Sequence, residues 1–160
     1  MENIIIKRTT DIKDAPAVHN FLYEAFEPYR PQYTAEALNA TVVISEKLEK
    51  RIADLDSIVL IAVFESEIAG TVSLLKAEEN NIYIASMAVN PVYHSKGVGS
   101  MLLKEIDKIA SEKQCSKLIL ETSAPLTDAI RLYEKFGYER TGKTTDYYGV
   151  TIFEMMKEVV

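Results

Sequence analysis

Cysteine and histidine are scarce in this sequence, and their scarcity argues against both disulfide bonds and metal sites. The single cysteine, Cys115, has no second cysteine with which to form an internal disulfide. The two histidines, His19 and His94, show no metal-ligand spacing with each other or with the cysteine. We therefore expect neither a disulfide framework nor a metal site.

Long apolar runs and a marked positive charge are also lacking. No run approaches the roughly 18 apolar residues of a membrane-spanning helix, so we expect no membrane association. The opening MENIIIKRTTD has no extended apolar stretch or small-residue cleavage site, which favours a cytoplasmic location. The formal net charge of −6 argues against non-specific nucleic-acid binding, because that mode needs clustered Lys and Arg on phosphates.

The length of the chain favours one compact core. With 160 residues it is short for two ordinary domains, so residues 1–160 are predicted to form a single domain. A short strand is expected over residues 4–7. A helix is expected to begin at Asp14, with Pro16 in its first turn, and to stop near Pro28.

A loop and a second helical region are predicted next, the loop from its prolines and the helical region from the spacing of its apolar residues. Residues 28–34, PYRPQYT, carry two prolines and are predicted to form a loop. A second helical region is predicted over residues 38–55, with Leu55 as the last member of its apolar stripe. The β-branched residues at 42–44 mark a place where this region could break.

From residue 57 onward the pattern becomes mainly that of strands. Three runs rich in β-branched and aromatic residues are joined by short polar connections suited to antiparallel hairpins. The strands are predicted over residues 57–65, 68–78, 80–91, 117–122 and 149–159, and the helices over 98–113 and 127–136. This order of elements predicts a mixed sheet flanked by helices.

The stretch YHSKGVGSMLLKEI, residues 93–106, places two glycines between a strand and a helix. It is not a dinucleotide fingerprint, because Leu102 stands where a third glycine is required, and it lacks the Gly-Lys pair of a phosphate loop. Two readings remain. Either it is a plain turn into a core helix, or its backbone N-H groups around Gly97 and Gly99 bind a pyrophosphate at the positive end of the helix dipole.

Three segments, in order, resemble the GCN5-related N-acetyltransferase family: MAVNPVYHSKGVGSMLLKEI, KLILET and AIRLYEKFGYERTG. The family's acetyl-coenzyme A motif has Gln or Arg, two residues, Gly, one residue, then Gly or Ala. Residues 94–99 read HSKGVG, so the glycines match and His94 replaces the usual Gln or Arg. Residues 132–138, LYEKFGY, match the family's L-Y-E-K-x-G-F/Y sequence. The resemblance covers essentially the whole chain and is strongest over residues 82–138.

The resemblance implies an α/β (α+β) fold with a mixed, mostly antiparallel central sheet, a splay between two parallel strands, and about four flanking helices. It also implies acetyl-coenzyme A as co-substrate, with the pantetheine arm pairing with the backbone of the first splayed strand as an added strand would. The residues expected to bind the coenzyme are Met87, Ala88, Val89, His94, Ser95, Lys96, Gly97, Val98, Gly99 and Ser100.

Two residues are candidates for proton transfer. An amine with a pKa of about 10.4 is rarely neutral at pH 7, so a group must accept its proton, and Glu121 at the end of KLILET is the candidate base, directly or through water. In the family the tyrosine matching Tyr133 points its hydroxyl at the coenzyme sulfur, where a phenol stabilises the leaving thiolate. The alternatives are a solvated strand-end glutamate and a tyrosine that only completes an apolar helix stripe.

The acceptor site is predicted from two polar and aromatic segments. Glu27, Tyr29 and Arg30 lie at the start of the 28–34 loop region, and Tyr147 and Tyr148 precede the last strand. The paired tyrosines look somewhat like the segment with which peptide N-terminal acetyltransferases grip substrate backbone, and an ordinary surface hairpin is an equal alternative. A polyamine, an aminoglycoside, an amino acid and a peptide all remain open as acceptors.

Two functional classes follow from these residues. The favoured one is an enzyme that transfers acetyl to the primary amine of a small molecule or peptide N-terminus by direct attack in a ternary complex. Direct attack is favoured because Cys115 lies outside both motifs and no activated nucleophile is evident. The alternative is a non-catalytic sensor or partner module that binds coenzyme A. A homodimer is compatible with the resemblance.

Overall fold

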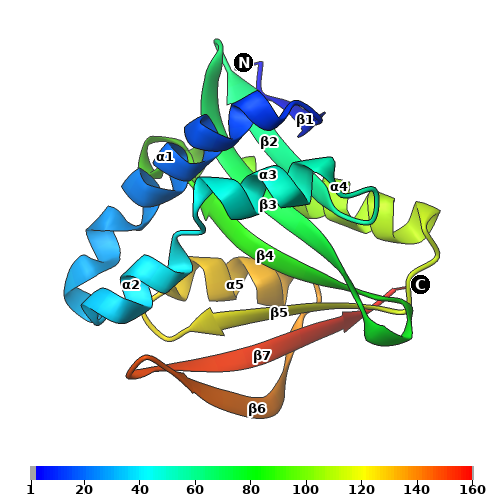
Figure 1. Cartoon of the computed structure of the whole chain (residues 1–160). Helices are drawn as coiled ribbons and strands as arrows, with labels where there is room; N and C mark the ends of the chain where they lie inside the picture. Colours follow the sequence, from blue (N-terminus) through cyan, green and yellow to red (C-terminus); the bar gives the residue numbers. More distant parts are fainter. Residues whose placement is uncertain (1–2, 160) are drawn as a thin grey trace.

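The computed structural model of the chain describes residues 3–159. Its seven strands form one sheet in the order β1-β2-β3-β4-β5-β7-β6 (Figure 1). The strands are β1 (Ile5–Thr9), β2 (Ile58–Phe64), β3 (Glu67–Ala77), β4 (Asn81–Val89), β5 (Lys117–Ser123), β6 (Glu139–Tyr147) and β7 (Val150–Glu158). Only β4 and β5 are parallel neighbours; the remaining pairs are antiparallel. The mixed, mostly antiparallel sheet is therefore confirmed.

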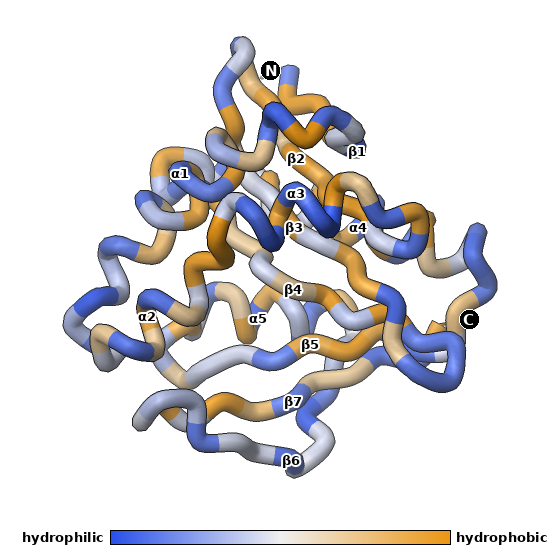
Figure 2. Tube along the Cα trace, in the orientation of Figure 1, coloured by the Kyte–Doolittle hydropathy of each residue, from blue (hydrophilic) through white to orange (hydrophobic). Residues whose placement is uncertain are grey.

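Within residues 3–159, five α-helices cover the two faces of the sheet (Figure 1). They are α1 (Ala15–Phe26), α2 (Ala35–Thr41), α3 (Ser45–Ala53), α4 (Val98–Glu112) and α5 (Thr127–Lys135). Strand alternation sends Val59 and Ile61 of β2 into a core with α1 and α3. Leu60 of β2 and Leu118 of β5 point instead into the larger core with α4 and α5. Figure 2 shows apolar residues concentrated in the central strands, while β6 is largely hydrophilic.

Two predictions for the first part of the chain need correction. The segment predicted as a loop at 28–34 begins inside a 3-10 helix, Glu27–Gln32, because Pro28 and Pro31 hold φ near the helical value. The second helical region breaks at the place that the β-branched residues marked, because an extended connection at 42–44 divides it into α2 and α3; its expected end is what needs correction. The helix then ends at Ala53, so Leu55 lies outside it and is 90% exposed.

The connection from β4 to α4 is longer than a tight turn. A six-residue 3-10 segment, Pro91–Lys96, leads from β4 to the helix and is capped by Asn90, whose Oδ1 accepts a hydrogen bond from the Val92 amide at 3.0 Å. Gly97 then adopts φ +78°, a left-handed conformation that side-chain-bearing residues rarely adopt. This single residue redirects the chain into α4.

Tyr138 carries a buried polar group that the core does not satisfy. The side chain is 2% exposed, packs edge-on against Tyr133 and makes no hydrogen bond through its hydroxyl within residues 3–159. Because an unsatisfied buried hydroxyl costs free energy, Tyr138→Phe is expected to raise the free energy of unfolding by about 1 kcal/mol. Urea denaturation checks this. A loss of stability of similar size would show that the hydroxyl has a partner.

Candidate active site

The sheet opens between its two parallel strands. Pairing of β4 with β5 runs only from Ile82↔Leu118 to Ile84↔Leu120. Beyond these pairs β4 continues along β3 as far as Val89, and β5 continues along β7 as far as Ser123. Each strand therefore follows its outer neighbour, and the β4 backbone over residues 85–89 has no strand partner on the side of the opening.

A bulge in β4 accounts for the opening. Between β3 and β4 the register passes from Thr71↔Ala88 to Ser73↔Ala85, so β4 contains one extra residue. Ser86 lies within the bulge at φ +52°, a strained value for a residue with a side chain. The hydroxyls of Ser73 and Ser86 both accept hydrogen bonds from Nη1 of Arg51, at 3.1 and 3.0 Å, which ties the bulge to α3.

Two cavities meet at the opening. The smaller, of about 250 Å³, lies between the end of β4, the start of α4 and α5. The larger, of about 550 Å³, lies between α2, α3, the open ends of β4 and β5, and the turn between β6 and β7. Four side chains line both: Phe26, Met87, Leu126 and Tyr133. The volume of the larger cavity lies within the usual range of small-ligand sites, about 300–1,000 Å³.

The smaller cavity contains most of the residues predicted to bind coenzyme. Its lining includes Met87, Ala88, Val89, His94, Gly97, Gly99 and Ser100. Tyr29, which was predicted on the acceptor side, also lines this cavity. Ser95 and Lys96 do not line it, and the Val98 side chain is fully buried in the core.

The N-terminus of α4 faces this cavity with unpaired backbone donors. The first internal bond of the helix runs from the Met101 amide to the Gly97 carbonyl at 3.0 Å, so the amides of residues 98–100 have no partner within the helix. Gly99 has a second role. A Cβ there would lie 2.6 Å from Cδ2 of Leu132, so glycine lets α4 and α5 approach closely beside the cavity.

His94 takes up a defined position at the rim. Its Nε2 lies 3.0 Å from the Val89 carbonyl oxygen. Because a carbonyl can only accept, Nε2 carries the proton in this contact. The residue that replaces the family's Gln or Arg therefore bonds to the end of β4, at one of the backbone groups predicted to pair with the pantetheine arm.

Tyr133 lies where the two cavities join. It lies on α5, and its side chain is buried in the larger core. Its hydroxyl makes no hydrogen bond to another residue within 3–159. Burial raises the pKa of Tyr133 to about 12. The phenol therefore stays protonated through the neutral range and keeps its proton available for donation into the cavities.

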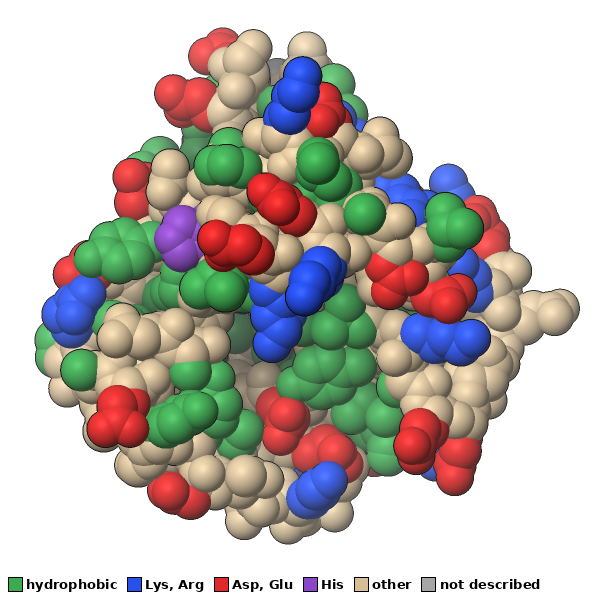
Figure 3. Space-filling model, viewed as in Figure 1, with side chains coloured by type: hydrophobic (Ala, Val, Ile, Leu, Met, Phe, Trp, Pro, Cys, Tyr) green, Lys and Arg blue, Asp and Glu red, His purple; other side chains and the backbone are tan. Residues whose placement is uncertain are grey.

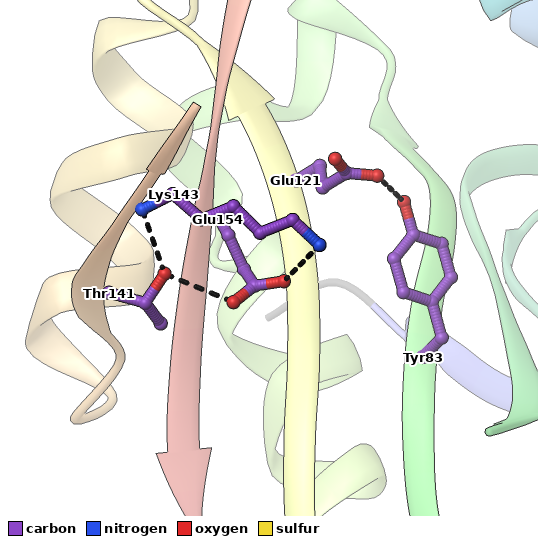
Figure 4. A network of polar contacts seen from close by, with 5 residues as sticks. All are labelled: Tyr83, Glu121, Thr141, Lys143 and Glu154. Atoms are coloured by element: carbon purple, nitrogen blue, oxygen red, sulfur yellow. Dashed lines mark hydrogen bonds and ion pairs between the residues drawn. The ribbon is translucent and has the colours of Figure 1, made fainter. Parts of the chain in front are cut away.

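Glu121 lies on the wall of the larger cavity and is held by a tyrosine. The Tyr83 hydroxyl donates to Oε1 of Glu121 at 2.8 Å, as Figure 4 shows. Burial, followed by the neighbouring carboxylate, raises the pKa of Tyr83. The tyrosine therefore remains a donor that orients the carboxylate, while Oε2 has no hydrogen-bond partner within residues 3–159.

A second acidic side chain flanks Glu121 across the β5-β7 pair. Glu154 is its directly paired neighbour in the register. Glu154 accepts a hydrogen bond from Thr141 at 3.0 Å and lies 4.0 Å from the Lys143 ammonium, so its charge is partly compensated from β6 (Figure 4). Glu154 does not line either cavity, which distinguishes it from Glu121.

The predicted acceptor residues are only partly brought together. Tyr147 and Tyr148 line the larger cavity and pack edge-on at 5.0 Å between ring centroids. Glu27 and Arg30 instead pair with each other through two contacts of 2.8 Å on the exposed surface and line neither cavity. The Arg30 guanidinium lowers the pKa of Glu27.

Several cavity residues were missed by sequence reasoning. Tyr33 lines the larger cavity, and its hydroxyl lies 2.8 Å from Oγ of Ser123. Its neighbour Thr34 does not line the cavity but donates to the Tyr148 carbonyl at 2.6 Å. These contacts join the segment before α2 to two residues of the cavity lining, Ser123 and Tyr148. Arg51, Tyr83 and Thr122 also line it. One feature of the sequence could have pointed to Arg51: it is a charged residue beside the apolar stripe that contains Leu48 and Ile52.

The structure also bears on metals and membranes, within residues 3–159. No group of three or more His, Cys, Asp or Glu side chains is close enough to hold a metal ion in this part of the chain. Among the same residues, no helix combines the length and apolarity needed to cross a bilayer.

A sheet opened between two parallel strands, with the start of a glycine-containing helix at the opening, defines the acetyltransferase class that the sequence resembles. The family model for the Acetyltransferase (GNAT) family matches residues 16–138. Because this match covers most of the chain, the protein belongs to the GNAT family.

Individual relatives match shorter stretches. N-alpha-acetyltransferase 30 of Xenopus laevis is 36% identical over 66 residues, which are 41% of this chain and 24% of that protein. N-acetylaspartate synthetase of Danio rerio is 30% identical over 88 residues, 54% of this chain and 31% of that protein. The chain thus matches about a quarter to a third of the length of these curated relatives.

A solved structure matches over nearly the full length. The PaiA N-acetyltransferase of Thermoplasma acidophilum, crystallised in complex with coenzyme A, is 25% identical. The alignment covers 98% of this chain and 99% of that one, with a TM-score of 0.79. The fold with a splay between its parallel strands is therefore confirmed.

Proposed function

We propose that the protein transfers an acetyl group from acetyl-coenzyme A to a primary amine of a small molecule or peptide N-terminus, by direct attack in a ternary complex. One observation carries this proposal: the two cavities meet at the buried Tyr133 side chain, whose hydroxyl is protonated and has no hydrogen-bond partner within residues 3–159. A donor in that position is suited to a leaving thiolate.

The residues around the smaller cavity fit a coenzyme A molecule. The amides of residues 98–100 provide unpaired donors for the diphosphate, and Gly97 and Gly99 keep side chains away from it. The open backbone edge of β4 at residues 87–89 would receive the pantetheine arm as an added strand would be received. Bound there, acetyl-coenzyme A supplies the activated acetyl thioester.

Protons must move at two places for the transfer to balance. The N–C bond forms as the thioester C–S bond breaks, the attacking amine gives up a proton, and the released thiolate takes one. Glu121 is the proposed acceptor of the amine proton, directly or through water, because Tyr83 holds Oε1 and Oε2 accepts no hydrogen bond from residues 3–159. The Tyr133 hydroxyl is the proposed donor to the sulfur.

The names of the relatives support an amino group as the acceptor. They include an N-alpha-acetyltransferase, an N-acetylaspartate synthetase and a thialysine N-epsilon-acetyltransferase, the last from Bos taurus. In all three the acetyl group is carried on nitrogen, while the remainder of the acceptor differs. The larger cavity with its Tyr147–Tyr148 pair is the proposed acceptor site.

Thiol release separates this enzyme from a coenzyme-binding sensor. The intact protein is mixed with acetyl-coenzyme A and a panel of amines, amino acids and N-terminal peptides, and free thiol is measured with a chromogenic disulfide. The proposal predicts release that depends on one group of acceptors and yields the N-acetylated product by mass spectrometry. Coenzyme binding without release for any acceptor would contradict the enzyme proposal and favour the sensor.

A further inference from the structure

One wall of the larger cavity carries a cation that no carboxylate among residues 3–159 neutralises. Arg51, on α3, is half-buried and lines this cavity. No carboxylate among residues 3–159 forms an ion pair with it, and its side-chain hydrogen bonds go to two serine hydroxyls. A partly desolvated charge without a counterion is unusual, because such groups are normally paired.

The hydrogen bonds of Arg51 leave its carboxylate-binding edge open. Both serine contacts are made by Nη1, which has two N-H groups to donate. The Nε and Nη2 donors have no partner within residues 3–159. These two atoms form the planar fork that binds a carboxylate through two parallel hydrogen bonds. The serines also fix the guanidinium, so the fork is held in place before any ligand arrives.

The charges around the cavity are divided between two sides. Lys47, one helical turn before Arg51, also lines the cavity and adds a second positive charge from α3. Glu121 supplies the negative charge from β5. Figure 3 shows this face of the molecule, with basic side chains reaching over a central hollow from the region of α3 and acidic side chains bordering it below.

We propose that the acceptor carries a carboxylate as well as its amine, and that Arg51 binds this carboxylate through its Nε–Nη2 edge. The inference rests on the proposed function, since it describes the acceptor of the same reaction. An ammonium directed to the Glu121 side and a carboxylate directed to the α3 side match the division of charge in the cavity. A polyamine or aminoglycoside, which offers only positive charge, does not match it.

The shared chemistry can come from a free amino acid or from a peptide whose first residue is acidic. The cavity volume of about 550 Å³ accommodates either, because it falls within the usual range of small-ligand sites.

The test compares acceptors that differ only in the carboxylate. The pairs are L-alanine with L-alaninamide, 4-aminobutyrate with 4-aminobutyramide, and aspartyl-alaninamide with asparaginyl-alaninamide, the last serving as the peptide arm. For at least one pair, kcat/KM of the wild type is expected to favour the acid. Arg51→Gln should reduce that preference roughly 10- to 100-fold, the usual effect of losing a charged hydrogen-bonded contact.

Two further variants separate recognition from structure. Arg51→Lys keeps the charge and loses the fork, so an intermediate loss of preference is expected. Lys50→Gln makes the same change of charge on an exposed neighbour outside the cavity and should leave the preference unchanged. If Arg51 only held the β4 bulge, Arg51→Gln would lower kcat/KM equally for both members of each pair, and the inference would be overturned.

The results of these experiments test the carboxylate site separately from the proposed enzyme activity. Turnover of amines with no acid preference in any pair would overturn the inference and leave the enzyme proposal standing. If no amine is acetylated, calorimetry with N-acetyl-L-alanine, N-acetyl-4-aminobutyrate and their amides in the presence of coenzyme A decides the matter. Tighter binding of an acid that Arg51→Gln abolishes would support the carboxylate site, and equal or absent binding would refute it.

Discussion

Tyr133→Phe is expected to lower the rate of acetyl transfer about 100-fold while leaving coenzyme affinity within about threefold, because general acid groups contribute roughly 10²- to 10⁴-fold. The substitution removes one hydroxyl and no apolar surface. Since burial raises the pKa of Tyr133 to about 12, the hydroxyl is protonated at every pH from 6 to 10. The deficit should therefore be nearly constant over that range, even as both rates rise with deprotonation of the acceptor amine.

Single-turnover measurements of thiol release test this, because they report the chemical step without product release. Tyr138→Phe is a matched control: it removes the same atom from a ring that packs edge-on against Tyr133, and Tyr138 lines neither cavity. The control should retain the wild-type rate. Near wild-type turnover by Tyr133→Phe across the pH range would rule out its role as proton donor.

Gly99→Val is expected to weaken coenzyme binding roughly 10- to 100-fold, since overpacking in a filled site costs about 1–3 kcal/mol and the new methyls also occupy the cavity. A Cβ at this position already lies 2.6 Å from Leu132 and 3.8 Å from the Val89 side chain. Leu132 lines the smaller cavity, so its displacement by the valine would change the shape of the space proposed for the coenzyme. Calorimetric titration with coenzyme A measures the loss.

The cause of this loss can be checked within the same helix. Ser111→Val introduces the same side chain at an exposed position near the far end of α4 and should leave binding unchanged. Adding Leu132→Ala to Gly99→Val should recover part of the affinity if the clash is the cause, as a double-mutant cycle would show. Unchanged coenzyme affinity in Gly99→Val would place the coenzyme elsewhere.

Local sequence patterns predicted most of the fold because each pattern has a direct physical cause. The runs at 57–65 and 68–78 form antiparallel strands because alternation and short polar turns determine their pairing. The break between α2 and α3 follows from β-branched residues. The 3-10 helix at Glu27–Gln32 was missed, because two prolines in a short segment are equally compatible with a loop and with a helical turn.

The candidate site was likewise predicted in part and missed in part. The residues around Gly97 and Gly99 were found because the motif combines backbone geometry with a fixed spacing. Arg51 was not found, because its place at the cavity depends on a bulge at Ser86 that the strand pattern of β4 does not reveal. The acceptor side is assembled from α2, α3, the open ends of β4 and β5, and the turn between β6 and β7, and no local pattern indicates which of their side chains converge.

The central claim is that the coenzyme enters the opening between β4 and β5 and ends at Tyr133. A crystal structure of the protein with coenzyme A tests it most directly. We predict the diphosphate on the amides of residues 98–100 and the sulfur within hydrogen-bonding distance of the Tyr133 hydroxyl. A coenzyme bound outside the opening, or a sulfur directed away from that hydroxyl, would contradict it.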